Sequence, residues 1–191
     1  MDDIVKRAMQ KWPDVPNVFG WLSLDRRGNW RVKGRSGGFE RIGNRAVVDF
    51  IGRNYAHDEK GRWFFQNGPQ RVFVRLDYTP FVFRLGADGT SFETHTGAQA
   101  GQVRAAWLDE NSELLLEADP GPGVVHDRDL AQLKLVDEGG RLIDDEAQMS
   151  GPIALELAGR QIALTRLRSD GVAARFGYDP RPAPAPGEPD C

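Results

Sequence analysis

The chain has 191 residues, of which 40% are hydrophobic and 28% are charged, and its net charge is −3. This length supports one large domain or two small ones, with a core that needs no metal or disulfide. The single cysteine, Cys191, excludes an internal disulfide and a cysteine-based zinc site. No apolar run reaches the roughly 18 residues of a membrane-spanning helix, and residues 1–12 lack the apolar stretch of a secretory signal. We therefore expect a cytoplasmic protein with no membrane partner.

The charges are distributed unevenly along the chain. Residues 1–85 carry 16 basic and 9 acidic residues, which gives a net charge of +7, whereas the remaining residues carry 9 basic and 19 acidic residues, which gives −10. A basic half joined to an acidic half suggests either two faces with different partners or two halves that attract each other.

The first third of the chain predicts a helix, a hairpin and a second helix. Apolar residues recur at helical spacing in 1–12, and two prolines then end the helix. Residues 20–34 alternate in the manner of two strands joined by a glycine-containing turn. Residues 35–43 read as a flexible connection, and Asn44 is suited to cap a short helix in 45–55.

The stretch from Gly61 to Leu85, GRWFFQNGPQRVFVRLDYTPFVFRL, predicts three strands. The Asn67-Gly68 pair is a strong signal for a tight turn between the first two strands, and DYTP marks the next turn. On the middle strand, alternation places Val72, Val74 and Leu76 on one face and Arg71, Phe73 and Arg75 on the other.

The second half of the chain repeats this order more loosely. Hairpins are predicted within 103–118 and 153–167, with a loop at 119–123 between the first hairpin and a short helix that begins at Asp127. Residues 171–178 read as a final strand.

Both halves therefore run in the order hairpin, short helix, turn and antiparallel strands. The predicted organisation is an N-terminal helix in residues 1–16, a basic first repeat in 17–88, an acidic second repeat in 89–179, and a disordered proline-rich tail in 180–191.

Three stretches lie between roughly Gly20 and Gly97, in the order GNWRVKG, DEKGRWFFQNGPQRVFVRLDYTPFVFRL and SFETHTG. A short helix is predicted after the first of them. In this order they resemble an uncharacterised proteobacterial family, a domain of unknown function. The resemblance implies an α+β fold of two similar repeats, each a curled antiparallel sheet packed on a short helix, to which the predicted N-terminal helix is added. It also implies a link to signalling, but no reaction and no catalytic residues. The longer linker GRSGGFER and the proline-rich tail depart from the family pattern, so no ligand site is carried over.

The motifs of common enzyme classes are missing from the sequence. It has no G-x-S-x-G nucleophile elbow, no phosphate-binding G-x-x-x-x-G-K-[ST], no dinucleotide-binding G-x-G-x-x-G after a strand and no H-E-x-x-H. We predict no cofactor, although catalytic groups can lie far apart in a sequence.

His126 has possible chemical partners close to it in the sequence. His126 precedes Asp127 and Asp129, and carboxylates near an imidazole are found in metal sites and acid–base pairs. The alternative is a helix N-terminus whose acidic side chains cap free N–H groups. We favour the cap, and no metal, because a metal site needs at least three converging ligands. The carboxylates at 144–146 leave a similar choice between a cation site and a solvated turn.

Aromatic and arginine residues alternate on the predicted strands of the first half. Such a pattern either stacks bases and holds phosphates, or forms a core wall on one face and solvated arginines on the other. The residues with this chemistry are Trp21, Trp30, Trp63, Phe65 and Phe73, with Arg26, Arg27, Arg31, Arg71 and Arg75. We favour the core wall, in which Phe73 fits least because it shares its face with arginines.

The favoured hypothesis is a non-catalytic binding module, linked to signalling, that holds a small molecule or a protein in the crevice between the repeats. The predicted ligand-binding residues are Trp30, Trp63, Phe73, Arg71, Arg75 and His95. One alternative is a nucleic-acid binder that uses a basic, aromatic-rich sheet in residues 17–85. A second alternative is an enzyme that uses His95 or His126 with nearby carboxylates.

Overall fold

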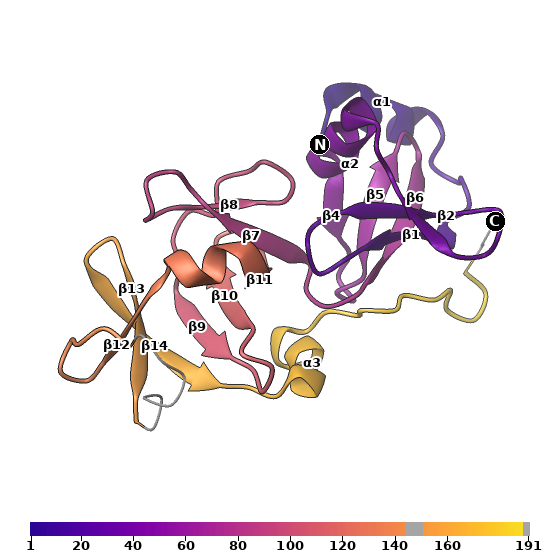
Figure 1. Cartoon of the computed structure of the whole chain (residues 1–191). Helices are drawn as coiled ribbons and strands as arrows, with labels where there is room; N and C mark the ends of the chain where they lie inside the picture. Colours follow the sequence, from indigo (N-terminus) through magenta and orange to yellow (C-terminus); the bar gives the residue numbers. More distant parts are fainter. Residues whose placement is uncertain (144–150, 189–191) are drawn as a thin grey trace. The chain divides into compact units, whose positions relative to one another are not determined.

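The computed structural model describes residues 1–143 and 151–188 (Figure 1). It confirms the predicted α+β class: two curled sheets are accompanied by a few short helices, with one short helix at the N-terminus. Contacts within the chain group the residues into two compact units. Unit 1 is Met1–Pro80 together with the residues from Ala173 onward, and unit 2 is Phe81–Val172. This grouping differs from the predicted repeats in assigning the C-terminal segment to the first unit.

Unit 1 contains the elements up to β6. In chain order they are α1 (Asp3–Lys11), β1 (Val18–Leu24), β2 (Trp30–Lys33), β3 (Phe39–Arg41), α2 (Arg45–Arg53), β4 (Tyr55–His57), β5 (Trp63–Asn67) and β6 (Gln70–Leu76).

The sheet of unit 1 has the strand order β3-β2-β1-β6-β5-β4. Its hairpins are antiparallel, as predicted, and the β5–β6 hairpin closes at Asn67 and Gln70. The central pair, β1 and β6, is parallel, with Leu24 opposite Leu76. Parallel neighbours require a long connection, and the chain here passes through β2, β3, α2, β4 and β5 before it returns as β6. The sheet is therefore mixed, where the sequence predicted only antiparallel strands.

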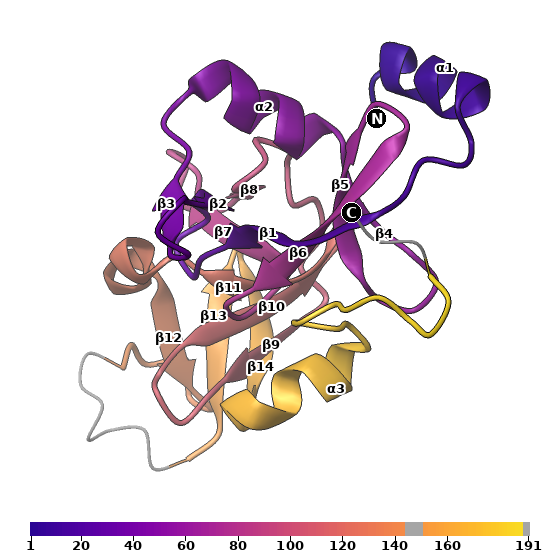
Figure 2. The same ribbon diagram turned by 90° about the vertical axis from the view of Figure 1, so that its right-hand side faces the viewer.

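Alternation gives this sheet two faces. The first, here called the helix face, carries the buried side chains of Leu24, Trp30, Phe65, Val74 and Leu76. Helix α2 packs on this face, where the rings of Phe50 and Phe65 have their centroids 5.4 Å apart (Figure 2). Each such buried apolar side chain contributes about 1.5–3 kcal/mol to folding.

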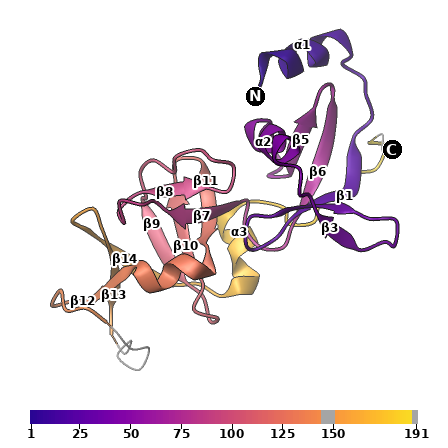
Figure 3. The same cartoon turned by 45° about the horizontal axis from the view of Figure 1, so that its top comes forward.

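Helix α2 begins as the sequence predicts, because the side chain of Asn44 accepts a hydrogen bond from the backbone N–H of Val47 at 3.3 Å. The helix ends at Arg53, two residues earlier than predicted, and Tyr55 then pairs with Phe65 as the first residue of β4. Figure 3 shows α2 beside β5 and α1 near the tip of the β5–β6 hairpin, where the Cβ of Ala8 lies close to Gly68.

The C-terminal segment completes the sheet of unit 1. The pairing of β5 with β6 reaches only to Phe64 and Phe73, which leaves the last part of β6 without a β5 partner. The backbone N–H of Leu76 there donates to the carbonyl of Pro180 at 2.9 Å, and the N–H of Asp179 donates to the carbonyl of Gly61 at 3.0 Å. The sequence predicted a disordered tail from residue 180; in the structure residues 180–188 make hydrogen bonds to the sheet and to Arg62.

Unit 2 holds the remaining strands. In chain order its elements are β7 (Phe81–Leu85), β8 (Phe92–Thr94), β9 (Ala105–Leu108), β10 (Leu114–Ala118), β11 (Gly121–Val125), the 3-10 helix η1 (Asp127–Gln132), β12 (Lys134–Asp137), β13 (Ile153–Leu157), β14 (Arg160–Arg166) and the 3-10 helix η3 (Ser169–Gly171). The last residue of unit 2, Val172, is the first residue of α3 (Val172–Phe176).

The sheet of unit 2 has the strand order β12-β13-β14-β9-β10-β11-β7-β8. The predicted hairpins are confirmed as β9–β10 and β13–β14. The pairs β7–β11 and β9–β14 are parallel, so this sheet is also mixed. Its core is aliphatic and aromatic, with Phe83, Leu115, Leu116, Val124 and Leu155 fully buried.

Three predicted segments differ from the structure. Residues 39–41 form β3 instead of a flexible connection, because they pair with β2. Residues 121–123, which the sequence placed in a loop at 119–123, belong to β11. A Cβ at Gly123 would lie 2.6 Å from the ring of Phe83, so this glycine permits a close approach between strands. Residues 171–178 contain a helix instead of a strand, as suits the good helix formers alanine and arginine in VAARF.

None of the helices in the described part of the chain is both long enough and apolar enough to cross a membrane.

Candidate functional site

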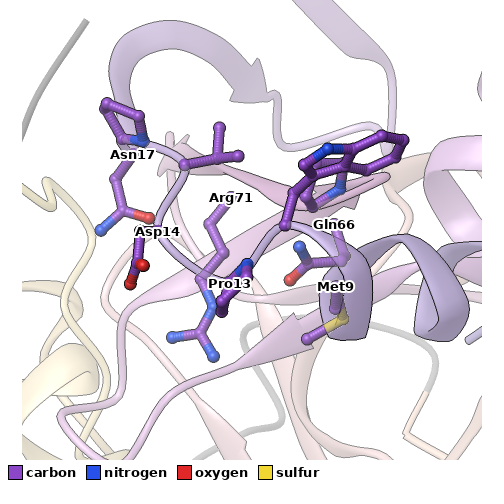
Figure 4. Close-up of a pocket in the computed structure, with 10 residues that line it drawn as sticks. Met9, Pro13, Asp14, Asn17, Gln66 and Arg71 are labelled. Carbon is purple, nitrogen blue, oxygen red and sulfur yellow. The ribbon is translucent and has the colours of Figure 1, made fainter.

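A pocket of about 520 Å³ lies in unit 1, between the linker that joins α1 to β1 and the β5–β6 hairpin (Figure 4). Its volume is in the range of small-molecule sites, roughly 300–1,000 Å³. The apolar wall is made by Met9, Trp12, Val15 and three prolines, and the polar lining by Asp14, Asn17, Gln66 and Arg71.

The linker of residues 12–17 is held open by its sequence and by its ties to the sheet. Pro13 and Pro16 have no N–H and a fixed φ, so they end α1 and keep the linker from coiling. The side chain of Gln70 donates to the carbonyl of Pro16 at 3.0 Å, and the side chain of Asn17 donates to Glu188 at 2.9 Å. These hydrogen bonds fix the position of the linker, and with it the wall of the pocket, in the fold of unit 1.

Gln66 supplies an acceptor that none of the described residues uses. Its side chain is 1% exposed, and its amide nitrogen donates to the carbonyl of Gly68 at 2.9 Å. This bond fixes which end of the amide is oxygen. The oxygen Oε1 has no hydrogen-bond partner among the described residues, and Figure 4 shows the amide pointing toward Pro13. A buried acceptor without a partner costs about 1–3 kcal/mol, which a ligand donor would recover.

Arg71 lies directly opposite Gln66 in the β5–β6 pairing, so both side chains are on the same face of the sheet. Its guanidinium group lies over the ring of Phe64, 4.6 Å from the centroid. It makes no ion pair or hydrogen bond with the described residues, so its charge and donors are available to an anion.

Burial divides the six predicted ligand-binding residues. Trp30 is 1% exposed and Trp63 is 6% exposed, and both rings pack against Tyr55. Arg71 lines the pocket, whereas Arg75 is exposed on the same strand. His95 belongs to unit 2, where its Nδ1 accepts a hydrogen bond from the backbone N–H of Val82 at 3.3 Å. The structure brings Arg71 into the pocket but places the aromatic rings in the core.

Phe73, the aromatic residue that fitted the core-wall interpretation least, is buried against aromatic and charged neighbours. Its ring stacks on Phe19 with centroids 4.5 Å apart and an angle of 6° between planes. The guanidinium of Arg62 lies 4.5 Å from its centroid. Phe73 can therefore share its face with arginines because one of them covers its ring.

Arg62 is itself clamped by two carboxylates. Nε donates to Asp58 at 2.7 Å and Nη1 donates to Glu188 at 2.7 Å. The hydrogen bond from Arg62 lowers the pKa of Glu188 to about 2, and the same pairing raises the pKa of Arg62. For Asp58, burial opposes ionisation, but the hydrogen bonds from Arg62 prevail and lower the pKa. This network holds the end of the described chain on the sheet of unit 1.

The clamp predicts an acid-sensitive contribution to stability. Because the folded pKa of Glu188 is below its ordinary value of 4.5, the contribution is complete above about pH 4.5 and is lost as the pH falls toward 2. We expect Glu188→Gln to destabilise unit 1 at neutral pH, and the difference from the unmodified protein to shrink at about pH 3. Urea unfolding at both pH values measures this; a difference that stays constant contradicts it.

On the face of the sheet that also carries Arg71 and Phe73, four directly paired positions form a row across four strands, and three of them are arginines. Arg41, Arg31, Ser23 and Arg75 occupy directly paired positions on β3, β2, β1 and β6. Beside the row, Trp21 is 51% exposed, with the Lys33 ammonium 6.0 Å from its ring, and Phe39 is half-buried below Arg75. These residues, Trp21, Ser23, Arg31, Lys33, Phe39, Arg41 and Arg75, are here called the arginine face.

Residues 126–129 form the helix N-terminus that was favoured from the sequence, but the N-cap residue is His126 and not one of the acidic residues. Its Nδ1 accepts a hydrogen bond from the backbone N–H of Arg128 at 3.2 Å at the start of η1. Burial lowers the pKa of its imidazole. Asp129 is 4% exposed and accepts from Arg84 at 2.6 Å and from the backbone N–H of Leu85 at 3.0 Å, so its carboxylate fixes η1 to β7.

The described residues contain no group of three or more histidine, cysteine or acidic side chains placed to hold a metal ion. The carboxylate cluster at 144–146, considered from the sequence as a cation site, lies outside the described residues.

The fold of the chain is similar to that of solved bacterial proteins. A DUF1285 family protein from Silicibacter pomeroyi DSS-3 superposes with a TM-score of 0.52 at 17% identity, covering 82% of this chain and 86% of that chain. A second DUF1285 family protein, from Shewanella baltica OS155, gives a TM-score of 0.42 at 12% identity over 57% of this chain and 86% of that chain. No curated protein matches the sequence.

The sheets and short helices thus define an α+β protein whose fold is similar to that of a DUF1285 family protein. The chain belongs to the family DUF2944, described as "Protein of unknown function (DUF2946)", whose model matches residues 1–183. The resemblance to a domain of unknown function is confirmed, and it covers the second half of the chain as well.

Sequence reasoning missed Gln66 and the linker that form the pocket. The two prolines of residues 12–17 and the polar Gln66 next to the Asn67-Gly68 turn were the available signals. Neither signal shows that the linker returns to the hairpin, because that contact joins residues about 50 positions apart.

Proposed function

We propose that the protein is a non-catalytic binding module that holds a small organic anion in the pocket of unit 1. The single observation that supports this most strongly is the pairing of the Gln66 oxygen with the Arg71 guanidinium on adjacent strands of one pocket, because neither group has a hydrogen-bond partner among the described residues. An acceptor and a cation side by side match a ligand whose N–H or O–H donor is close to its carboxylate or phosphate.

The apolar wall adds a preference for a ligand with a hydrophobic part. Met9 is half-buried and Trp12 is 51% exposed, so an aromatic or aliphatic group would cover surface that is now in water. The ligand class is therefore an acylated amino acid or a similar amphipathic anion. A link between such binding and signalling remains part of the proposal.

The test uses hippurate, an aromatic acylglycine whose N–H is one carbon from its carboxylate, and its N-methyl derivative, which lacks that donor. We expect hippurate to shift the NMR signals of the Gln66 side-chain amide and the Arg71 Nε–H in the full chain. Because a charge-assisted hydrogen bond contributes about 1.5–3 kcal/mol, Arg71→Met should weaken binding about tenfold or more. N-methylhippurate should bind about threefold more weakly or worse.

Arg75→Met is the matched control, since Arg75 lies on the same strand and the same face but does not line the pocket. It should leave the affinity for hippurate unchanged. Equal losses in the two variants, or no saturable shift at either side chain, would contradict the proposal.

The enzyme hypothesis receives less support. His126 caps η1 and is 6% exposed, and neither it nor His95 lines the pocket of Figure 4. The crevice between the repeats, expected from the sequence as the binding place, stays a prediction.

A further inference from the structure

The arginine face of unit 1 combines positive charge with aromatic rings on one side of a sheet. Its row of paired positions spans three strand-to-strand steps, which is about 14 Å. The row is basic at three of its four positions, and Lys33 adds a fourth cation beside Trp21. The opposite face of the sheet is covered by α2, so the two faces are chemically distinct.

Few acidic groups neutralise these cations. Asp77 is shared by two of them, at 3.3 Å from the Arg31 guanidinium and 4.0 Å from that of Arg75. Arg41 and Lys33 have no acidic partner among the described residues. The face therefore has an excess of positive charge that needs an external partner with several negative charges.

Ser23 lies between Arg31 and Arg75 in the row, and its hydroxyl has no hydrogen-bond partner among the described residues. Ser23 is only 1% exposed. A phosphate bound between the two arginines would draw the guanidinium groups upward and give this hydroxyl an acceptor.

The aromatic rings decide the class of partner. Trp21 presents half of its surface to solvent with a cation 6.0 Å from its ring, and Phe39 is bordered in the same way by Arg75. Proteins that bind single strands without a sequence code use this combination, in which bases stack on rings while nearby cations follow the phosphates. A duplex hides its bases from such rings, and a membrane surface offers charge without stacking partners.

We propose that the arginine face binds single-stranded nucleic acid, with Trp21 as the main stacking ring and Arg31, Arg41 and Arg75 on the phosphates. This site is separate from the pocket of Figure 4 and does not depend on a ligand there.

The test is fluorescence anisotropy of the full chain with a labelled thymidine dodecamer at low salt. We expect Trp21→Ala to weaken binding about fivefold or more, because stacking contributes about 1–3 kcal/mol per base, and Trp21→Phe to restore most of the affinity. Arg41→Gln and Arg75→Met should each lower the slope of log affinity against log salt by about 0.7.

Three controls separate the sources of binding. Arg45→Gln removes a charge from α2, on the other side of the sheet, and should leave the affinity for the dodecamer and its salt dependence nearly unchanged. Arg71→Met removes the cation of the pocket, and in this background Trp21→Ala should still weaken binding. An abasic dodecamer should bind more weakly than the thymidine dodecamer and be insensitive to Trp21→Ala.

The proposal is overturned if the dodecamer does not bind at low salt, or if the abasic and thymidine strands bind equally. Binding to vesicles that contain phosphatidylserine in the absence of binding to the dodecamer would instead assign the face to an anionic membrane. Because hippurate binding depends on Arg71 and dodecamer binding on Trp21, failure of either proposal is visible without failure of the other.

Discussion

Replacing Gly61 by alanine is expected to destabilise unit 1 by roughly 3 kcal/mol, the sum of backbone strain and a forced displacement. Gly61 has a φ of +72°, and a Cβ there would lie 2.1 Å from the carbonyl oxygen of Gly177 and 2.9 Å from the Cα of Tyr178. Both contacts are with backbone, which cannot rotate away as a side chain can. The C-terminal segment would have to leave the edge of the sheet.

Hydrogen exchange measures this effect locally. The amides of Leu76 and Asp179 bond across the contact, so both should lose protection in Gly61→Ala. The bond from the Tyr178 hydroxyl to the carbonyl of Tyr78, at 2.9 Å, should be lost with them.

Gly20→Ala is the matched control for Gly61→Ala. Gly20 has a φ of +73° but no atom within 4 Å of its Cβ position, so the variant introduces the same strain without the collision. We expect a loss of about 1 kcal/mol and unchanged protection of Asp179. Equal destabilisation by the two variants would show that the contact with Gly177 does not matter.

Replacing Asp129 by alanine is expected to destabilise unit 2 by roughly 2 kcal/mol. The variant loses the charge-assisted bond from Arg84 at 2.6 Å and leaves the backbone N–H of Leu85 without its acceptor. Arg84 can turn to solvent because its side chain is half exposed, so the cost is below that of a fully buried pair. Urea unfolding followed by the fluorescence of Trp107, in β9 of the same unit, measures the change.

The effect of Asp129→Ala should depend on pH. Burial opposes ionisation of Asp129, but the hydrogen bonds from Arg84 and Leu85 prevail and hold its pKa below the ordinary value of 3.8. The stabilisation is therefore complete above that value and is lost as the pH falls below it, so the variant and the unmodified protein should converge in acid.

Glu156→Ala provides the comparison with an exposed ion pair in the same unit. Its carboxylate is 3.8 Å from the Lys134 ammonium, and both side chains are more than one-third exposed. Such pairs contribute about 0–1 kcal/mol. A loss in Glu156→Ala as large as that in Asp129→Ala would mean that burial of the Asp129 carboxylate is not the cause.

Much of the local structure was determined by the sequence alone. The Asn67-Gly68 turn, the Asn44 cap and the alternation of Val72, Val74 and Leu76 with Arg71, Phe73 and Arg75 are all confirmed. These features depend on residues at most a few positions apart, so propensity and period are sufficient to predict them. The helix N-terminus next to His126 follows from the same kind of local signal, although His126 itself is the cap.

Tertiary structure decided the features that join distant residues. Local sequence patterns do not predict three long-range contacts of the fold. These are the parallel pairing of β1 with β6, the hydrogen bonding of residues 177–180 near Gly61, and the closure of the pocket by the linker. The glycines and prolines of residues 119–123 predict a loop because they weaken a strand, yet residues 121–123 belong to β11, where packing against Phe83 requires a residue without Cβ at Gly123.

The candidate sites show the same division. Composition and alternation showed that the predicted strands of the first half carry aromatic rings and arginines, but could not separate buried rings from exposed ones. Phe73 is buried because Phe19 and Arg62 cover it, whereas Trp21 remains exposed on the same face. The Gln66 oxygen has no hydrogen-bond partner among the described residues because of the neighbours that folding brings near it. These neighbours are determined by the packing of the chain and cannot be found from the order of its residues.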